Sequence, residues 1–152
     1  MSSKTNRQAG FSLAELLGVL ALIGIVVAIG IPIVNEQVRI ADIRSAADNM
    51  AVHLRAARMI AVSHHKNIVV TVSVDPTNSY SYETTNGTVR TVTMPGTAKL
   101  ISGSAGTITF HSDGSSGASS TVTIESIVSA STERWTLTVN TLGMVSVAHT
   151  RV

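Results

Sequence analysis

A long apolar run near the start of the chain constrains its fold more than any other feature. Residues 16–34 carry no charge, and the 24 residues from 11 to 34 carry only that of Glu15. A helix of that length rises about 36 Å, more than the roughly 30 Å hydrocarbon core of a bilayer. We therefore expect residues 11–34 to form a transmembrane helix.

The order of features around this run differs from that of a secretory signal peptide. Such a signal has an apolar region of about 7 to 15 residues, followed by a cleavage site of small residues. Here the apolar run is longer, and the small pair Ala9-Gly10 precedes it, after a polar start with Lys4 and Arg7. This order predicts a cut before the apolar helix, which leaves that helix on the mature protein.

The stretch Gly10-Phe11-Ser12-Leu13-Ala14-Glu15, between a short basic leader and a long apolar helix, resembles a known processing signal. It is similar to the type III signal of type IV pilins and type II secretion pseudopilins. The resemblance implies that residues 1–10 are a leader peptide, that a prepilin peptidase cleaves after Gly10, and that Phe11 becomes N-methylated. It also implies a bacterial inner-membrane location, with the leader in the cytoplasm and the head in the periplasm.

Glu15 is the residue of this stretch that most needs a function, because an ionisable side chain inside a membrane segment is a functional candidate by default. Cleavage after Gly10 would create a positive amine on Phe11, one helical turn away. An unpaired charge is costly in lipid or in a packed helical core. The resemblance implies that Glu15 of one subunit pairs with the Phe11 amine of a neighbouring pilin or pseudopilin subunit during filament assembly.

Gly24 and Pro32 mark the weakest part of the expected helix. Pro32 removes the backbone hydrogen bond to Ala28 and is expected to kink or loosen the helix. Two interpretations stay open. In the first, Gly24 and Pro32 have no special function, because glycine and proline are common in membrane helices. In the second, which the resemblance implies, this segment melts locally when subunits pack into a filament.

Beyond the apolar run, residues 35–65 predict an amphipathic continuation of the same helix, to about Ser63. Apolar residues recur at spacings of three and four, which places them on one helix face. These residues are Ile40, Ile43, Ala47, Met50, Leu54, Ala57 and Ala61. His64 and His65 follow, and adjacent side chains point in different directions, so helix-end cations are favoured over a metal site.

Residues 66–152 predict a β-rich globular head, because β-branched residues alternate there with Ser, Thr and Gly. The expected strands are 68–74, 79–85, 88–94, 106–110, 121–128, 134–139 and 144–149, with a tight turn at Asn86-Gly87. The expected core is Ile68, Val70, Val72, Ile108, Phe110, Val122, Ile124, Trp135, Leu137 and Val139. The predicted fold is α+β: a long N-terminal helix packed on an antiparallel sheet or small β-sandwich.

Two elements of the head resemble the GspH/FimT branch of the pilin-like proteins. One runs from Ile108-Thr109-Phe110 to Gly114, and the other from Trp135-Thr136-Leu137-Thr138-Val139 to Gly143. The resemblance implies a minor pseudopilin or pilin that initiates or caps a type II secretion pseudopilus or a type IV pilus.

DNA binding is the alternative function, since some FimT-like relatives bind DNA through basic residues after the late glycine. Here only His149 and Arg151 fit that description. Affinity for DNA comes mainly from clustered Lys and Arg. Of eleven Lys and Arg, two lie in the leader, which leaves nine against nine Asp and Glu, and the cations of the head are scattered. The sequence therefore favours the structural role.

A membrane-anchored exported enzyme is the alternative of another class. The chain has no cysteine, which excludes a thiol nucleophile and a cysteine zinc site. His111-Ser112-Asp113 offers two metal ligands, but a polar loop after a strand accounts for them better. The serines show no nucleophile-elbow pattern. We expect no enzymatic activity and no cofactor.

Overall fold

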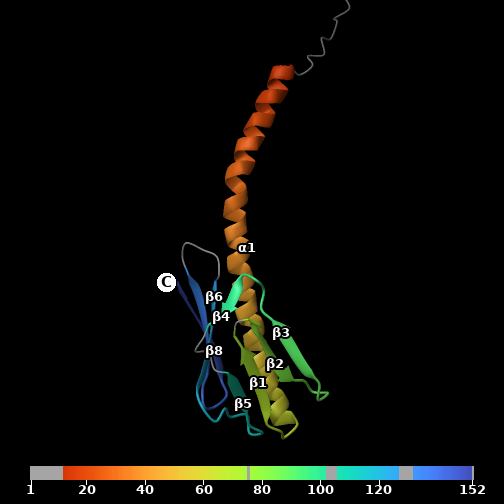
Figure 1. Cartoon of the computed structure of the whole chain (residues 1–152), viewed down its shortest axis with the longest axis vertical. Helices are drawn as coiled ribbons and strands as arrows, with labels where there is room; N and C mark the ends of the chain where they lie inside the picture. The colour runs from red at the N-terminus through yellow and green to blue at the C-terminus, as the bar shows by residue number, and fades with distance from the viewer. Residues whose placement is uncertain (1–11, 75, 102–105, 127–131, 152) are drawn as a thin grey trace, which may run out of the picture. The chain divides into compact units, whose positions relative to one another are not determined.

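The computed structural model describes residues 12–74, 76–101, 106–126 and 132–151, and of residues 30–34 it describes only the backbone. These residues form one helix and a series of strands (Figure 1). The elements are α1 (Leu13–Ser63), β1 (Ile68–Ser73), β2 (Ser79–Glu83), β3 (Val89–Thr93), β4 (Ala98–Leu100), β5 (Thr107–Phe110), β6 (Ser120–Ser126), β7 (Glu133–Val139) and β8 (Val145–Arg151).

The chain divides into two compact units, one up to Gln37 and one from Val38 onward. In the first unit α1 is helical through both Gly24 and Pro32, and the side chains of residues 12–29 are exposed. Among the residues that the structure describes, no helix is long and apolar enough to span a membrane. The predicted span 11–34 includes Phe11 and the side chains of residues 30–34, which lie outside the described part.

The second unit contains two antiparallel four-stranded sheets. Their strand orders are β3-β2-β1-β5 and β4-β6-β7-β8. The second and third predicted strands form a hairpin, β2 with β3, and Gly87 takes the positive φ of 76° that its tight turn requires. The predicted α+β fold is confirmed, with most strand ends moved by one or two residues.

Two differences from the predicted strands have simple reasons. The short strand β4, which pairs with β6, was not predicted, because three residues are too few to display a period-two pattern. The predicted strand 121–128 ends at Ser126 in the described part, and residues 127 and 128 lie outside it.

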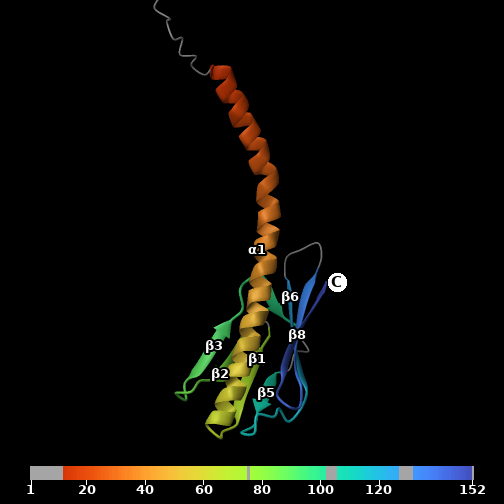
Figure 2. The same cartoon turned by 180° about the vertical axis from the view of Figure 1, so that it is seen from behind.

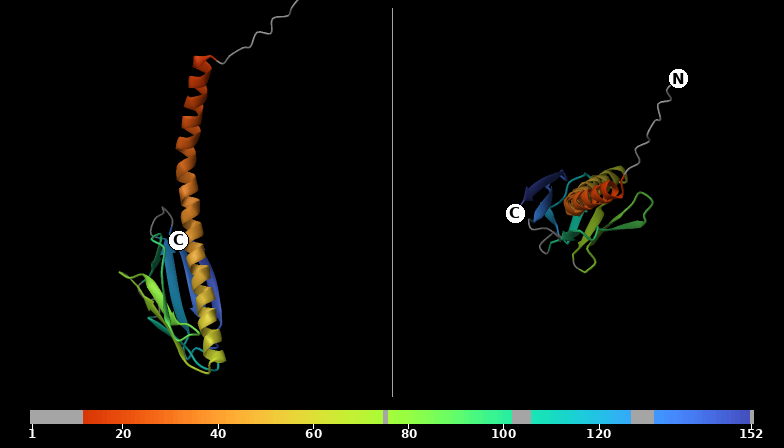
Figure 3. Two further views of the ribbon diagram at one scale, coloured as in Figure 1. Left: turned by 90° about the vertical axis from the view of Figure 1, so that its right-hand side faces the viewer. Right: turned by 90° about the horizontal axis from the view of Figure 1, so that it is seen from above.

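The C-terminal half of α1 covers the inner faces of both sheets, and its opposite face is uncovered (Figures 2 and 3). Each predicted stripe residue from Ile43 to Ala61 is buried, and Ile40 is partly buried at the margin. All ten predicted core residues of the strands are buried as well. The structure adds several that the pattern missed: Tyr80, Tyr82, Met94, Ala98 and Leu100.

A histidine on α1 joins the helix to the first sheet. The Tyr80 hydroxyl lies 2.6 Å from Nδ1 of His53, and the His53 ring also packs against Tyr82 with ring centroids 5.3 Å apart. Burial raises the pKa of Tyr80, which keeps its hydroxyl protonated and able to donate. Burial, followed by the charge of Arg90, lowers the pKa of His53 below its ordinary 6.5, so the ring stays neutral and accepts that hydrogen bond.

This contact predicts a pH dependence with a definite sign. In the unfolded chain His53 has its ordinary pKa of 6.5, whereas in the folded chain the pKa of His53 is lower. The free energy of unfolding should therefore carry the full contribution of His53 above that pH and lose it as the pH falls toward the folded pKa. An NMR titration of the full chain should give a His53 midpoint below 6.5. A midpoint at or above the ordinary value would contradict the predicted effect of burial.

Candidate assembly site

The N-terminus of α1 is closed by a capping box between Ser12 and Glu15. The backbone N–H of Ser12 donates to Oε2 of Glu15 at 3.1 Å, and the N–H of Glu15 lies 3.2 Å from Oγ of Ser12. Such a reciprocal pair satisfies two of the backbone donors that a helix start leaves without partners. It gives Glu15 a local structural role that the sequence analysis missed, although Ser12-x-x-Glu15 is the spacing that predicts it.

The structure describes little of the other predicted functional residues near the N-terminus. Gly10 and Phe11 lie outside the described residues, so their cleavage and methylation stay predictions. Gly24 is helical with open space around it, and Pro32 is described only as helical backbone. Melting of this segment was predicted for the packed filament and stays a prediction.

In the second unit, Arg58 of α1 holds two loops of the head together. Its Nε donates to the carbonyl oxygen of Gly114 at 2.8 Å, and its terminal nitrogen donates to that of Leu142 at 3.2 Å. Gly114 and Gly143 have φ values of 83° and 73°, a region that favours glycine. Arg58 thereby ties the loop after β5 to the turn between β7 and β8, one from each sheet.

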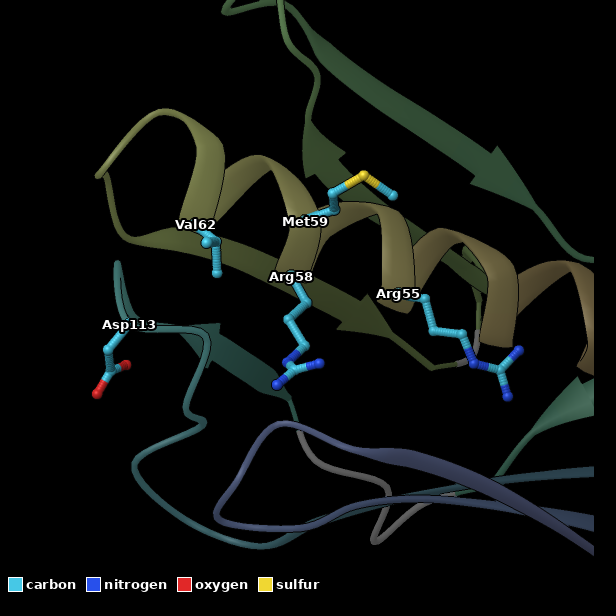
Figure 4. Close-up of a pocket in the computed structure, with 5 residues that line it drawn as sticks. All are labelled: Arg55, Arg58, Met59, Val62 and Asp113. Carbon is cyan, nitrogen blue, oxygen red and sulfur yellow. The ribbon is translucent and has the colours of Figure 1, made fainter.

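A pocket of about 520 Å³ lies beside Arg58, lined by Arg55, Arg58, Met59, Val62 and Asp113 (Figure 4). Both arginines reach from α1 toward the second sheet, and Arg55 donates to the carbonyl oxygen of Val145 at 3.3 Å. Oδ1 of Asp113 accepts from the N–H and the hydroxyl of Ser115, which lowers the pKa of Asp113. Across the described residues, neither arginine forms an ion pair with a carboxylate.

The two residues proposed for DNA contact lie together at the second sheet. Nε2 of His149 lies 2.6 Å from Oε2 of Glu133, and Nε of Arg151 lies 3.3 Å from Oε1 of the same carboxylate. Glu133 is buried, and the His149 ring stacks on Trp135 with centroids 4.4 Å apart. A buried carboxylate needs hydrogen-bonding partners, and both side chains serve Glu133 in this way.

The predicted polar loop is present at His111, Ser112 and Asp113, where Ser112 donates its N–H to Oδ1 of Asn67 at 3.2 Å. Within the described ranges, no group of three His, Asp or Glu side chains is placed to hold a metal ion. In this loop the Asp113 carboxylate closes a turn by accepting from Ser115.

Two family models match the chain. One is the prokaryotic N-terminal methylation motif, over residues 5–31. The other is type II transport protein GspH, over residues 46–143, more than half of the chain. The chain belongs to the GspH family. The matched region of this GspH-family chain contains most of the buried stripe of α1, all of β1–β7 and the turn at Gly143.

Two solved structures have a similar fold, both of the type IV minor pilin FimU from Pseudomonas aeruginosa. The first is 18% identical with a TM-score of 0.57, and the match covers 71% of this chain and 89% of that chain. The second is 21% identical with a TM-score of 0.52, covering 69% and 91%. No curated protein matches the chain. Family and fold are therefore those of pilin-like structural proteins.

The contact between the two glycine turns generates a stability prediction. A Cβ added at Gly143 would lie 2.1 Å from the backbone oxygen of Gly114 and 2.9 Å from Nε of Arg58. Gly143→Ala should therefore destabilise the head by about 2–4 kcal/mol, from the positive φ and the forced separation of the loops. Chemical denaturation of the full chain measures this.

Gly96→Ala is the matched control, because a Cβ there would meet nothing within 4 Å. Its effect should stay within about 1 kcal/mol. Equal effects of the two substitutions would contradict the clash.

Proposed function

We propose that this GspH-family chain is a minor pseudopilin or pilin. It is cleaved by a prepilin peptidase between Gly10 and Phe11, N-methylated at Phe11, and assembled into a type II secretion pseudopilus or a type IV pilus. One observation supports this most strongly: the methylation motif over residues 5–31 precedes a GspH head over residues 46–143 in one chain. A processing signal and a pilin-like head together fit a filament subunit.

Residues 11–34 are the proposed membrane anchor before assembly. Their length and lack of charge other than Glu15 support this. The leader would then lie in the cytoplasm and the head in the periplasm of the bacterial inner membrane, as the resemblance implies.

The capping box suggests that Glu15 acts twice. In the uncleaved chain its carboxylate accepts from the Ser12 N–H at the start of α1. After cleavage, the new amine of Phe11 is a stronger partner, since a hydrogen bond between charged groups is about twice as strong as a neutral one. We propose that the carboxylate then pairs with the amine of a neighbouring subunit, which fixes the position of each new subunit.

DNA uptake is not the function we propose. His149 and Arg151, the only basic residues after Gly143, both contact the buried carboxylate of Glu133. Arg151 is paired with this carboxylate, and a paired cation attracts phosphate less than the clustered Lys and Arg on which DNA affinity depends.

Substitution of Glu15 separates its two proposed roles. Glu15→Gln keeps an oxygen that can accept from Ser12 but removes the charge, whereas Ser12→Ala removes the side-chain cap and keeps the charge. If charge pairing drives assembly, Glu15→Gln and Glu15→Ala should both reduce incorporation into sheared filaments by about tenfold or more. Ser12→Ala should change incorporation much less.

Immunoblots of cell and sheared-filament fractions measure these effects, with leader removal scored on the same samples. All variants should be synthesised and processed normally. Normal incorporation of Glu15→Gln would contradict the pairing role and leave only the cap.

The cleavage site gives an independent prediction. Gly10→Ala should slow the prepilin peptidase, visible as a persistent precursor of higher mass in electrophoresis or mass spectrometry. Ala9→Ser, one residue earlier, is the control and should leave most of the chain processed. Ordinary processing of Gly10→Ala would place the cut elsewhere.

A further inference from the structure

Arg55 and Arg58 bring two guanidinium groups to the pocket of about 520 Å³ beside α1. They lie three residues apart, so both side chains leave the same face of the helix, as Figure 4 shows. Each guanidinium has more N–H donors than its contacts with carbonyl oxygens use. Neither is paired with a carboxylate of the described residues. The pocket therefore has a positively charged side that is open to an anion.

Arg58 is held in place before any ligand arrives. Its hydrogen bonds to the carbonyl oxygens of Gly114 and Leu142, at 2.8 and 3.2 Å, fix the plane of its guanidinium. A side chain that is already ordered loses less conformational entropy on binding, which favours affinity. The pocket thus combines one fixed guanidinium, at Arg58, with an exposed one beside it, at Arg55.

Met59 and Val62 give the same pocket an apolar side. Their side chains are 70% and 43% exposed. Apolar side chains that line a pocket together with a few polar groups are typical of ligand-binding sites. Methionine also adapts its shape to different apolar partners. An apolar group of a ligand would cover both side chains.

Asp113 adds a hydrogen-bond acceptor to the pocket, from the loop after β5. Its Oδ1 accepts from the N–H and the hydroxyl of Ser115, at 2.9 and 2.7 Å, which holds the carboxylate in place. Its Oδ2 is then able to accept from a ligand.

Gly114 brings this loop close to the helix without filling the space beside it. A Cβ there would lie 2.9 Å from Cγ2 of Val62 and 3.4 Å from Nε of Arg58. Any side chain would therefore push the loop away from α1. The close approach allows Asp113 to line the same pocket as the two arginines.

The carboxylate of Asp113 distinguishes the ligand of this pocket from a simple anion. A phosphate group would be attracted by the arginines but repelled by Asp113, and it would leave Met59 and Val62 uncovered. The last residue of a peptide offers a complement to every side of the pocket. Its carboxylate suits the guanidinium groups, its backbone N–H suits Asp113, and an apolar side chain suits the apolar pair.

We propose that this pocket binds the C-terminal residue of a partner protein whose chain ends in an apolar side chain. Arg55 and Arg58 hold the terminal carboxylate through charge-assisted hydrogen bonds, for which the guanidinium geometry is well suited. The apolar side chain covers Met59 and Val62, and Asp113 accepts from the last backbone N–H. Proteins are known to recognise peptides by capturing a chain-terminal carboxylate. Binding of this kind goes beyond the proposed filament function, because it needs no assembled filament.

Two peptides that differ only at the terminal group test the role of the carboxylate. The probes are acetyl-Gly-Ala-Leu with a free carboxylate and the same peptide as its C-terminal amide. Each is titrated into the full-length chain in detergent micelles, and binding is measured by NMR or calorimetry. The free acid should bind at millimolar concentration, and the amide about tenfold or more weakly, because it loses the charge-assisted hydrogen bonds. Equal binding of the two peptides, or no binding of the free acid, would overturn the proposal.

Substitution of Arg55 locates the bound carboxylate. Arg55→Gln removes the charge at the cost of one exposed hydrogen bond, whereas Arg58 also joins two loops. It should weaken binding of the free acid by about tenfold. Arg44→Gln is the matched control, because it removes the charge of a well-exposed arginine of α1 outside the pocket. It should change the affinity by less than about twofold, and equal losses in the two variants would contradict a site at Arg55.

The other groups of the ligand are tested with two further probes. Acetyl-Gly-Ala-Ser should bind about threefold or more weakly than the peptide ending in leucine, because it buries less apolar surface on Met59 and Val62. Inorganic phosphate should bind about tenfold or more weakly than the leucine peptide, because Asp113 repels it. Equal affinity for the two peptides would show that the apolar pair does not select the last residue. Phosphate binding as tight as that of the leucine peptide would show a general anion site, and either result would overturn the proposal.

Discussion

The packing of one helix stripe against two sheets is the contact on which the rest of the head depends. Each sheet has an apolar inner face. Leaving either face in water would cost about 25 cal/mol of free energy per Å² of apolar surface. The buried stripe of α1 covers both faces at once. Its alanines Ala47, Ala57 and Ala61 are fully buried. Burial of this kind supplies most of the stability of such a helix.

Much of this arrangement follows from periodicity. The buried residues of β7, Glu133, Trp135, Leu137 and Val139, alternate with half-buried ones, and the three apolar members were predicted from that alternation. The helix stripe was equally readable from its spacings of three and four. In both elements the local sequence pattern determines which residues are buried, because each element has one face turned to the core.

Features that depend on distant parts of the chain could not be predicted in this way. Arg58 lies outside the predicted apolar stripe, and its partners Gly114 and Leu142 lie far along the sequence. Tyr80 and Tyr82 were missed as core residues because Ser and Glu surround them in the sequence. Glu15 is a different case, because the spacing Ser12-x-x-Glu15 is that of a capping box and predicts the local partner that the structure shows.

The stacked pair of Trp135 and His149 has a practical consequence. Trp135 is the only tryptophan of the chain, and its ring rests on an imidazole that belongs to the neighbouring strand β8. The tryptophan fluorescence of the protein therefore reports on the contact between β7 and β8. Emission that changes while the helix content stays constant would signal that β8 has separated from β7, without any label. The head thus carries its own optical reporter of the pairing between β7 and β8.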